Sequence, residues 1–328
     1  MIITRTPLRI PLGGGGTDLP SFYEKYGSFF ISASLDYYIY VAVKHRPLKG
    51  IRLGHSQIEE VSNISQITHP IIKASLKYLK IPTKRGLEIA SIGDLPSSTG
   101  LGSSGSFTVG LVHALLVMNK KKITKEALAK FACDININKL KNPSGKQDEY
   151  IASYGGITCF RIDKKGSIQS YPLAISSKTI QKLESNLMMF YTGITRTSRI
   201  PLTNQKRDIN KGNKKTIDNL MEIQKIGYEI KNALEAGNTK LFGTLLDKHW
   251  MLKRQRKNTS NEKIDRCYNI AKANGAIGGK IMGAGGGGFF LFYCEKNKTK
   301  IRKALEKEGL EELKFHFDFE GTKLILNS

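Results

Sequence analysis

Hydrophobic and polar residues alternate along some segments of the chain, and apolar residues recur at helical spacing along others. Residues 2–10, 28–44 and 87–91 combine this alternation with β-branched side chains, which is typical of strands. From Ser103 to Met118 the apolar residues return every three or four positions, which predicts a helix. Segments of the same two kinds predict further strands at 187–192, 289–294 and 323–326, and helices at 71–79, 124–133, 216–236, 239–253, 261–274 and 299–308.

Strands and helices are mixed in both halves of the chain, without strict strand–helix–strand alternation. This order predicts an α+β fold rather than a doubly wound parallel sheet. The length of 328 residues suits two domains of roughly 150 residues each. A polar stretch at 167–187 predicts the boundary near residue 180, which divides the chain into domains 1–180 and 181–328. The basic stretch 206–215 predicts a loop.

The chain carries 52 Lys and Arg against 28 Asp and Glu, a net charge of +24. Such a charge attracts nucleic acid or phosphorylated metabolites, although AT-rich coding, suggested by abundant Ile and Asn, is an alternative cause. We expect no dedicated nucleic-acid partner, because no zinc finger, arginine-rich arm or aromatic-interleaved motif is present. No apolar stretch approaches the roughly 18 residues of a membrane span. Four scattered cysteines without a Cys-x-x-Cys pair favour a reducing cytoplasm.

Three segments are rich in glycine: 13–16, 96–105 and 283–288. Glycines allow backbone N–H groups to surround an anion, and a helix N-terminus adds favourable dipole charge. The middle segment leads directly into the predicted helix from Ser103 and also brings hydroxyl groups. It therefore predicts a binding site for the phosphates of a nucleoside triphosphate, formed by Pro96, Ser97, Ser98, Thr99, Gly100, Leu101, Gly102, Ser103, Ser104 and Gly105.

The glycines also allow two other interpretations. The spacing Gly100-x-Gly102-x-x-Gly105 matches the dinucleotide-binding fingerprint, but that fingerprint needs a strand running straight into its first glycine. Here residues 94–99 intervene, and the Walker P-loop sequence is absent from the chain. Glycines that serve only tight turns are the remaining alternative, most of all for segment 13–16.

The glycine segments lie within a wider resemblance. Residues 6–18, 96–106 and 282–289 resemble the three motifs of the GHMP kinases (galactokinase, homoserine, mevalonate and phosphomevalonate kinases), in the same order. Residues 13–20 and 145–148 are similar to the heptose 7-phosphate kinase branch, as is 275–280. The resemblance implies a ribosomal-protein-S5-like N-terminal domain and a ferredoxin-like C-terminal domain.

For function, the resemblance implies ATP-dependent, Mg²⁺-assisted phosphorylation of a small sugar phosphate. The expected reaction converts D-glycero-D-manno-heptose 7-phosphate to the 1,7-bisphosphate, for nucleotide-activated heptose used in surface polysaccharide. A GHMP kinase for a free sugar, such as fucose or galactose, is one alternative. A basic nucleic-acid-binding protein is the alternative outside the enzyme class. The oligomeric state stays open, and an oligomer is allowed.

The resemblance also implies roles for individual residues. Asp148 matches the catalytic base and Arg9 the arginine beside it; a solvated aspartate and a strand-edge salt bridge are the alternatives. Ser104 matches the hydroxyl that contacts Mg²⁺. Thr17 and Asp18 match ligands of sugar hydroxyls, with a helix N-cap as the alternative for Asp18.

Further contacts with the substrate follow from the same motifs. Arg196, in a glycine turn after a predicted strand, is the leading candidate for the 7-phosphate, because arginine binds phosphate through two parallel hydrogen bonds. Several family members place a glutamate shortly before the catalytic aspartate to hold Mg²⁺, whereas residues 135–138 contain no acid. Asp134, Asn136, Asn138 or ATP alone would then complete the metal shell. The remaining substrate candidates are Gly14, Gly15, Gly16, Lys146, Gly285 and Gly286, with Lys253 and Lys280 as further phosphate candidates.

Overall fold

The computed structural model describes residues 1–195 and 199–328. Its first sheet has eight strands and is organised around two long ones, β1 (Ile2–Gly13) and β2 (Ser28–Arg46). The strand order is β12-β1-β2-β5-β3-β4, and β6 pairs with both β2 and β7. The other strands are β3 (Ile51–Gly54), β4 (Ile58–Val61), β5 (Gly86–Gly93), β6 (Ile157–Ile162), β7 (Ile168–Pro172) and β12 (Lys323–Asn327).

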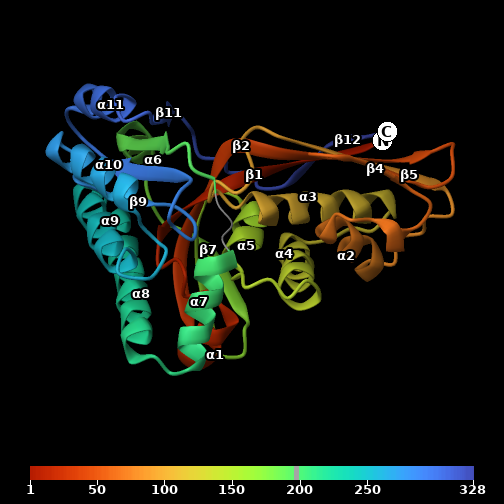
Figure 1. Ribbon diagram of the computed structural model, residues 1–328, viewed down its shortest axis with the longest axis horizontal. Helices are drawn as coiled ribbons and strands as arrows, with labels where there is room; N and C mark the ends of the chain where they lie inside the picture. Colours follow the sequence, from red (N-terminus) through yellow and green to blue (C-terminus); the bar gives the residue numbers. More distant parts are fainter. Residues whose placement is uncertain (196–198) are drawn as a thin grey trace.

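Helices cover one face of this sheet (Figure 1). The central one, α3 (Ser103–Met118), packs against β1 and β2 through apolar residues that include Leu111 and Leu115, both fully buried. The other helices of this part of the chain are α1 (Pro20–Tyr26), η1 (Ile64–Gln66), α2 (Pro70–Tyr78), α4 (Lys125–Cys133), the π-helical turn η2 (Asp134–Lys139) and α5 (Gln147–Tyr154).

The second sheet is smaller and entirely antiparallel, with the order β11-β8-β10-β9. It comprises β8 (Leu187–Tyr191), β9 (Gly278–Ile281), β10 (Phe289–Tyr293) and β11 (Glu311–Leu313), and its helices are α6 (Ser177–Asn186), α8 (Lys214–Glu235), α9 (Thr239–Lys253), α10 (Glu262–Ala273) and α11 (Lys298–Glu306). Strands and helices are mixed in both parts, which confirms the predicted α+β architecture. The division at residue 180 falls inside α6 and stays a prediction.

Helix α8 reaches back to the first sheet and packs against the end of β1. A Cβ atom on Gly13 would lie 3.0 Å from Ile230, and one on Gly227 would lie 3.1 Å from the Cα of Gly14. This close approach requires small residues on both partners, so part of the first glycine segment serves helix packing. Ile226 and Ile230 join the same hydrophobic core as Ile10 of β1.

The basic stretch 206–215 is helical apart from a turn at 211–213, so the prediction of a loop over the whole stretch was wrong. Residues 206–210 belong to α7 (Arg199–Asn210), and 214–215 open α8. The apolar residue Ile209 is fully buried against Phe22 and Leu220. The sequence did not indicate a helix here, because charged residues dominate the stretch and Ile209 is its one buried apolar residue.

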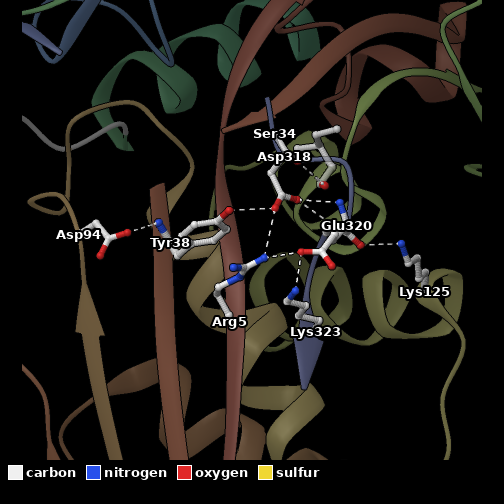
Figure 2. Close-up of polar contacts among 10 residues, drawn as sticks. Arg5, Ser34, Tyr38, Asp94, Lys125, Asp318, Glu320 and Lys323 are labelled. Carbon is white, nitrogen blue, oxygen red and sulfur yellow. Dashed lines mark hydrogen bonds and ion pairs between the residues drawn. The ribbon is translucent and has the colours of Figure 1, made fainter. Parts of the chain in front are cut away.

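The C-terminal segment returns to the first sheet, where β12 pairs with β1. Figure 2 shows how the carboxylate of Asp318 accepts a 3.0 Å hydrogen bond from the Tyr38 hydroxyl and lies 3.6 Å from the Arg5 guanidinium. Glu320 pairs with both Arg5 and Lys323 at 2.5 Å. The two ends of the chain consequently lie side by side (Figure 1). Among the described helices, none is both long and apolar enough to cross a membrane.

Candidate active site

A cavity of about 850 Å³ is lined by residues from both parts of the chain. The first part contributes Arg9, Ser104 and Asp148, whereas the second contributes Arg256 and Lys280. The segments that carry these residues are far apart in sequence, and the contact of α8 and β9 with β1 brings them together. A cavity of this size accommodates a nucleotide together with a small second substrate.

The middle glycine segment forms one wall of the cavity and ends at the N-terminus of α3. Gly102 precedes the helix with a φ of +79°, and Gly100 has a φ of +83°, so both adopt a conformation that favours glycine. The first N–H groups of α3 have no partner within the helix and suit an anion. The segment residues that line the cavity are Ser97, Ser98, Gly100, Gly102, Ser103, Ser104 and Gly105; Pro96, Thr99 and Leu101 do not line it.

The third glycine segment supports the middle one by direct backbone contact. A Cβ on Gly283 would lie 2.7 Å from the Cα of Gly100, and a Cβ on Gly288 would lie 2.1 Å from the carbonyl oxygen of Thr99. Both positions have positive φ angles as well. The two loops therefore fit together only because neither carries side chains at the contact.

Arg9 and Asp148 form an ion pair beside the start of α3. Nη2 and Nε of Arg9 lie 2.6 and 2.8 Å from Oδ1 of Asp148, and Nη1 donates to the carbonyl oxygen of Gly100 at 2.6 Å. Arg9 is almost completely buried, whereas the Asp148 side chain is one-third exposed to the cavity. A Cβ on Gly105 would lie 2.6 Å from the Cβ of Asp148, so the helix brings its backbone directly against the carboxylate.

Asp18 lies in the cavity wall close to Asp148 and is buried. Its Oδ2 accepts a 2.9 Å hydrogen bond from the backbone N–H of Gln147, the first residue of α5. Burial raises the pKa of Asp18, and the negative charge of Asp148 adds to the rise, although the Gln147 hydrogen bond opposes it. Asp18 does not cap its own helix, since Leu19 is the N-cap residue of α1.

Only some of the other predicted substrate residues line the cavity. Gly15, Gly16 and Gly285 line the cavity. Thr17 donates to the carbonyl oxygen of Gly14 at 2.8 Å and shares a 2.7 Å hydrogen bond with Ser28, so its hydroxyl is fully engaged inside the loop. The residues that do not line the cavity are Gly14, Thr17, Lys146 and Gly286, and their contacts with substrate stay predictions.

Lys146 donates to the carbonyl oxygen of Gly166 at 2.7 Å and lies over the ring of Tyr23, so its ammonium group is engaged by residues outside the cavity lining. Arg196 lies outside the described residues, and its predicted role in phosphate binding stays a prediction.

Glu149 is a cavity residue that sequence reasoning missed. It is buried directly after Asp148, and burial and the Asp148 charge raise its pKa. The amide Nδ2 of Asn136 donates to Glu149 at 2.6 Å and to Thr108 at 3.1 Å. The Oδ1 atom of Asn136 is buried without a hydrogen-bond partner. The two adjacent acids Asp148 and Glu149, at the start of α5, were the available signal for Glu149.

Three aromatic rings line another part of the cavity and were also missed. The ring centroids of His55 and His69 are 4.8 Å apart, and those of His69 and Phe107 are 5.3 Å apart. Burial lowers the pKa of His69, and the proximity of His55 lowers it further. Nearby Ile71 and Leu95 also line the cavity. Aromatic rings and aliphatic side chains of this kind suit a flat nucleobase.

Two family models match the chain. Residues 69–156 match the family described as GHMP kinases N terminal domain, and residues 230–311 match GHMP kinases C terminal. The chain is 29% identical to the D-glycero-alpha-D-manno-heptose 7-phosphate kinase of Campylobacter jejuni, over 98% of both chains. It is 30% identical to the mevalonate kinase of Methanocaldococcus jannaschii, over 73% of this chain and 72% of that one.

A solved structure shows the same fold over the full length. The structure described as a D-glycero-D-manno-heptose 1-phosphate kinase from Bacteroides thetaiotaomicron superimposes with a TM-score of 0.83 and 21% identity, covering 100% of both chains. The three glycine segments, the fold and the relatives lead to one assignment. The chain belongs to the GHMP kinase family and is an ATP-dependent kinase.

Proposed function

We propose that this kinase phosphorylates the anomeric C1 hydroxyl of D-glycero-D-manno-heptose 7-phosphate and yields the 1,7-bisphosphate and ADP. The observation that carries the proposal is the Arg9–Asp148 pair beside the N-terminus of α3, in a chain similar over almost its whole length to a heptose 7-phosphate kinase. The product would supply nucleotide-activated heptose for surface polysaccharide. We place this reaction in the cytoplasm, where the four buried thiols stay reduced.

In the proposed reaction, Asp148 accepts the proton of the anomeric hydroxyl as its oxygen forms a bond to the γ-phosphorus of ATP. The bond between the γ-phosphorus and the β,γ-bridging oxygen breaks, and ADP leaves. Arg9 orients Asp148, because its guanidinium holds one carboxylate oxygen from two nitrogens. The positive charge of Arg9 also favours the negative charge that develops on the transferred group.

The nucleotide would bind with its phosphates at the glycine segment and its base among the aromatic rings. The backbone N–H groups at the start of α3 and the hydroxyls of Ser103 and Ser104 supply donors to phosphate oxygens. The base would contact His69 and Phe107, whose rings line the same cavity. This orientation directs the γ-phosphate toward Arg9, which contacts the carbonyl oxygen of Gly100 in the loop.

The cavity residues also fit a magnesium ion, which prefers oxygen ligands. The side-chain Oδ1 atom of Asn136 is buried and lacks a partner. The carboxylate of Glu149 lies beside this side chain, and Ser104 supplies a hydroxyl. Asp134 and Asn138 instead bond to each other at 2.5 Å and do not line the cavity. We propose Ser104, Asn136 and Glu149 as the residues that hold Mg²⁺. When bound, the ion neutralises charge on the phosphates of ATP.

The acceptor sugar would bind near Asp18 and the first glycine segment. Asp18, Gly15 and Gly16 line the cavity, and Gln147 carries a buried Nε2 group without a partner there. Unsatisfied polar atoms of this kind favour a ligand with many hydroxyls, because an unpaired buried donor costs about 1–3 kcal/mol.

The function is tested by incubating the purified protein with Mg-ATP and a panel of heptose 7-phosphates, hexoses and hexose 6-phosphates. ADP release measures turnover, and ³¹P NMR identifies the product. We expect a new anomeric phosphate with D-glycero-D-manno-heptose 7-phosphate alone. Turnover with only a free sugar would contradict the proposed substrate while keeping the kinase class.

A further inference from the structure

One end of the cavity is rich in basic residues. His249 and Lys253 of α9, Arg256 just after it and Lys280 of β9 all line this end. Over residues 1–195 and 199–328, neither Arg256 nor Lys280 forms an ion pair with a carboxylate. Buried cations without acidic partners are costly, and they are normally balanced by a bound anion.

One nitrogen of the Arg256 guanidinium is hydrogen-bonded, whereas another has no hydrogen-bond partner. Its Nη1 donates to the side-chain oxygen of Gln205 at 2.6 Å, and Gln205 in turn donates to the carbonyl oxygen of Gly16 at 2.7 Å. The Nε atom of Arg256 is buried and has no hydrogen-bond partner. This arrangement fixes the guanidinium beside the first glycine segment with a donor still to be satisfied.

Lys280 extends the positive charge from Arg256 toward the reaction centre. It is 1% exposed, and its ammonium group donates to the carbonyl oxygen of Leu12 at 3.2 Å and lies 3.4 Å from Nδ1 of His249. Burial lowers the pKa of Lys280 to about 7, with a further contribution from the charge of Arg9. Burial lowers the pKa of His249, and the charges of Lys280 and Arg256 lower it further. A row of basic residues therefore leads from Arg9 to Arg256.

The phosphates of ATP do not account for this end of the cavity. They are expected at the N-terminus of α3, which approaches the row from the Arg9 side. Arg256 instead lies beside Gly16, two positions before Asp18, in the part of the cavity assigned to the acceptor. The anion at Arg256 would consequently belong to the acceptor.

We propose that Arg256, oriented by Gln205 and supported by Lys280, binds the phosphate group that the acceptor sugar already carries. The inference rests on the proposed function, since it assumes a phosphorylated acceptor. An arginine binds a phosphate through charge-assisted parallel hydrogen bonds, and Nε is one of the donors of that geometry. The sequence predicts Arg196 for this role, but Arg196 lies outside the described residues. The contacts of Arg256, by contrast, belong to the part of the chain that the structure describes.

The test compares D-glycero-D-manno-heptose 7-phosphate with the same heptose lacking phosphate, using wild type, Arg256→Gln and Arg256→Lys. Arg254→Gln is the matched control, because Arg254 carries the same charge two residues away but pairs with Asp265 at 2.8 Å outside the cavity. We expect Arg256→Gln to raise KM for the 7-phosphate by roughly tenfold or more. KM for ATP, and KM or Ki for the free heptose, should stay near wild type, and Arg256→Lys should recover part of the loss.

The outcomes distinguish failure of the proposed phosphate site from failure of the proposed reaction. Equal effects of Arg256→Gln on the phosphorylated and free heptose, or no effect on either, would overturn the phosphate site while turnover by wild type still supports the reaction. Wild type that phosphorylates only the free heptose would overturn the reaction itself. Circular dichroism and thermal unfolding check that each variant is folded. Should Arg256→Gln not fold, Gln205→Leu releases the guanidinium instead, and an unchanged KM for the 7-phosphate in that variant would overturn the proposal.

Discussion

The guanidinium group of Arg9 contacts Asp148 through a single carboxylate oxygen. Nη2 and Nε lie 2.6 and 2.8 Å from Oδ1, while the third nitrogen, Nη1, holds the carbonyl oxygen of Gly100. Arg9 therefore links the phosphate-binding loop to the proposed base. Because both hydrogen bonds use Oδ1, the arginine orients Asp148 without occupying Oδ2, the oxygen that we assign to the acceptor hydroxyl.

Replacement of Asp148 by Asn should remove the proton acceptor and keep the shape of the site. We expect kcat to fall by about 10²–10⁴-fold, the usual contribution of a general base, while ATP binding measured by calorimetry stays close to wild type. Asp218→Asn is the control, since Asp218 is exposed on α8 and does not line the cavity. Near-normal turnover of Asp148→Asn would show that the base lies elsewhere.

Gly145 should tolerate no side chain, because it packs against Asp18. A Cβ there would lie 1.9 Å from Oδ2 of Asp18, the oxygen that accepts from Gln147. We expect Gly145→Ala to displace Asp18 and to raise KM for the sugar, with KM for ATP almost unchanged. Gly54→Ala is the control, because its Cβ would make only an ordinary 3.7 Å contact. Unaltered sugar KM in Gly145→Ala would argue against Asp18 as a sugar ligand.

The fold was largely predictable because its elements carry strong periodic signals. The strand expected at 2–10 extends to Gly13, and the helix expected at 239–253 is found at those residues. Short-range patterns report which face of an element is buried. They contain no information on the return of β12 to β1 across the whole chain, since that pairing depends on contacts such as Asp318 with Tyr38.

The candidate site was likewise predictable where its residues are close in sequence, and not where folding brings distant residues together. The phosphate-binding loop was visible because its glycines and the following helix are contiguous in sequence. Glu149 was not, because its importance comes from Asn136, a residue on a π-helical turn that only folding brings beside it. Arg256 was hidden for the same reason among 52 lysines and arginines, since only its contact with Gln205 and its buried Nε distinguish it.

Glu149 should contribute to metal binding as well as to turnover. Glu149→Gln keeps the size of the side chain and removes its charge, so we expect roughly 10–100-fold weaker Mn²⁺ binding in the presence of ADP, measured by electron paramagnetic resonance. Glu126→Gln, at an exposed pair with Lys130, provides the control. Mn²⁺ affinity equal to wild type in Glu149→Gln would exclude the carboxylate from the metal site.

Lys280 should make the free energy of unfolding increase as the pH rises through the alkaline range. Its pKa falls from 10.5 to about 7 on burial, so the folded chain releases a proton that the unfolded chain retains. Between these pH values the unfolded state binds more protons, and the free energy of unfolding must rise as the pH increases through this window. The penalty for burying the charge is present in full below pH 7.

Lys280→Met removes this titration together with the buried charge. Replacing buried charges by apolar side chains often stabilises a protein by about 1–4 kcal/mol, so we expect Lys280→Met to be more stable than wild type at pH 7. The difference should shrink as the pH approaches 10. Urea unfolding at several pH values measures both effects, with Lys225→Met, at an exposed position of α8, as the control. If wild type and Lys280→Met showed the same slope of stability against pH, the amine of Lys280 would not titrate in this window. Its charge would then be retained in the folded protein throughout, which would strengthen its role in attracting the acceptor phosphate.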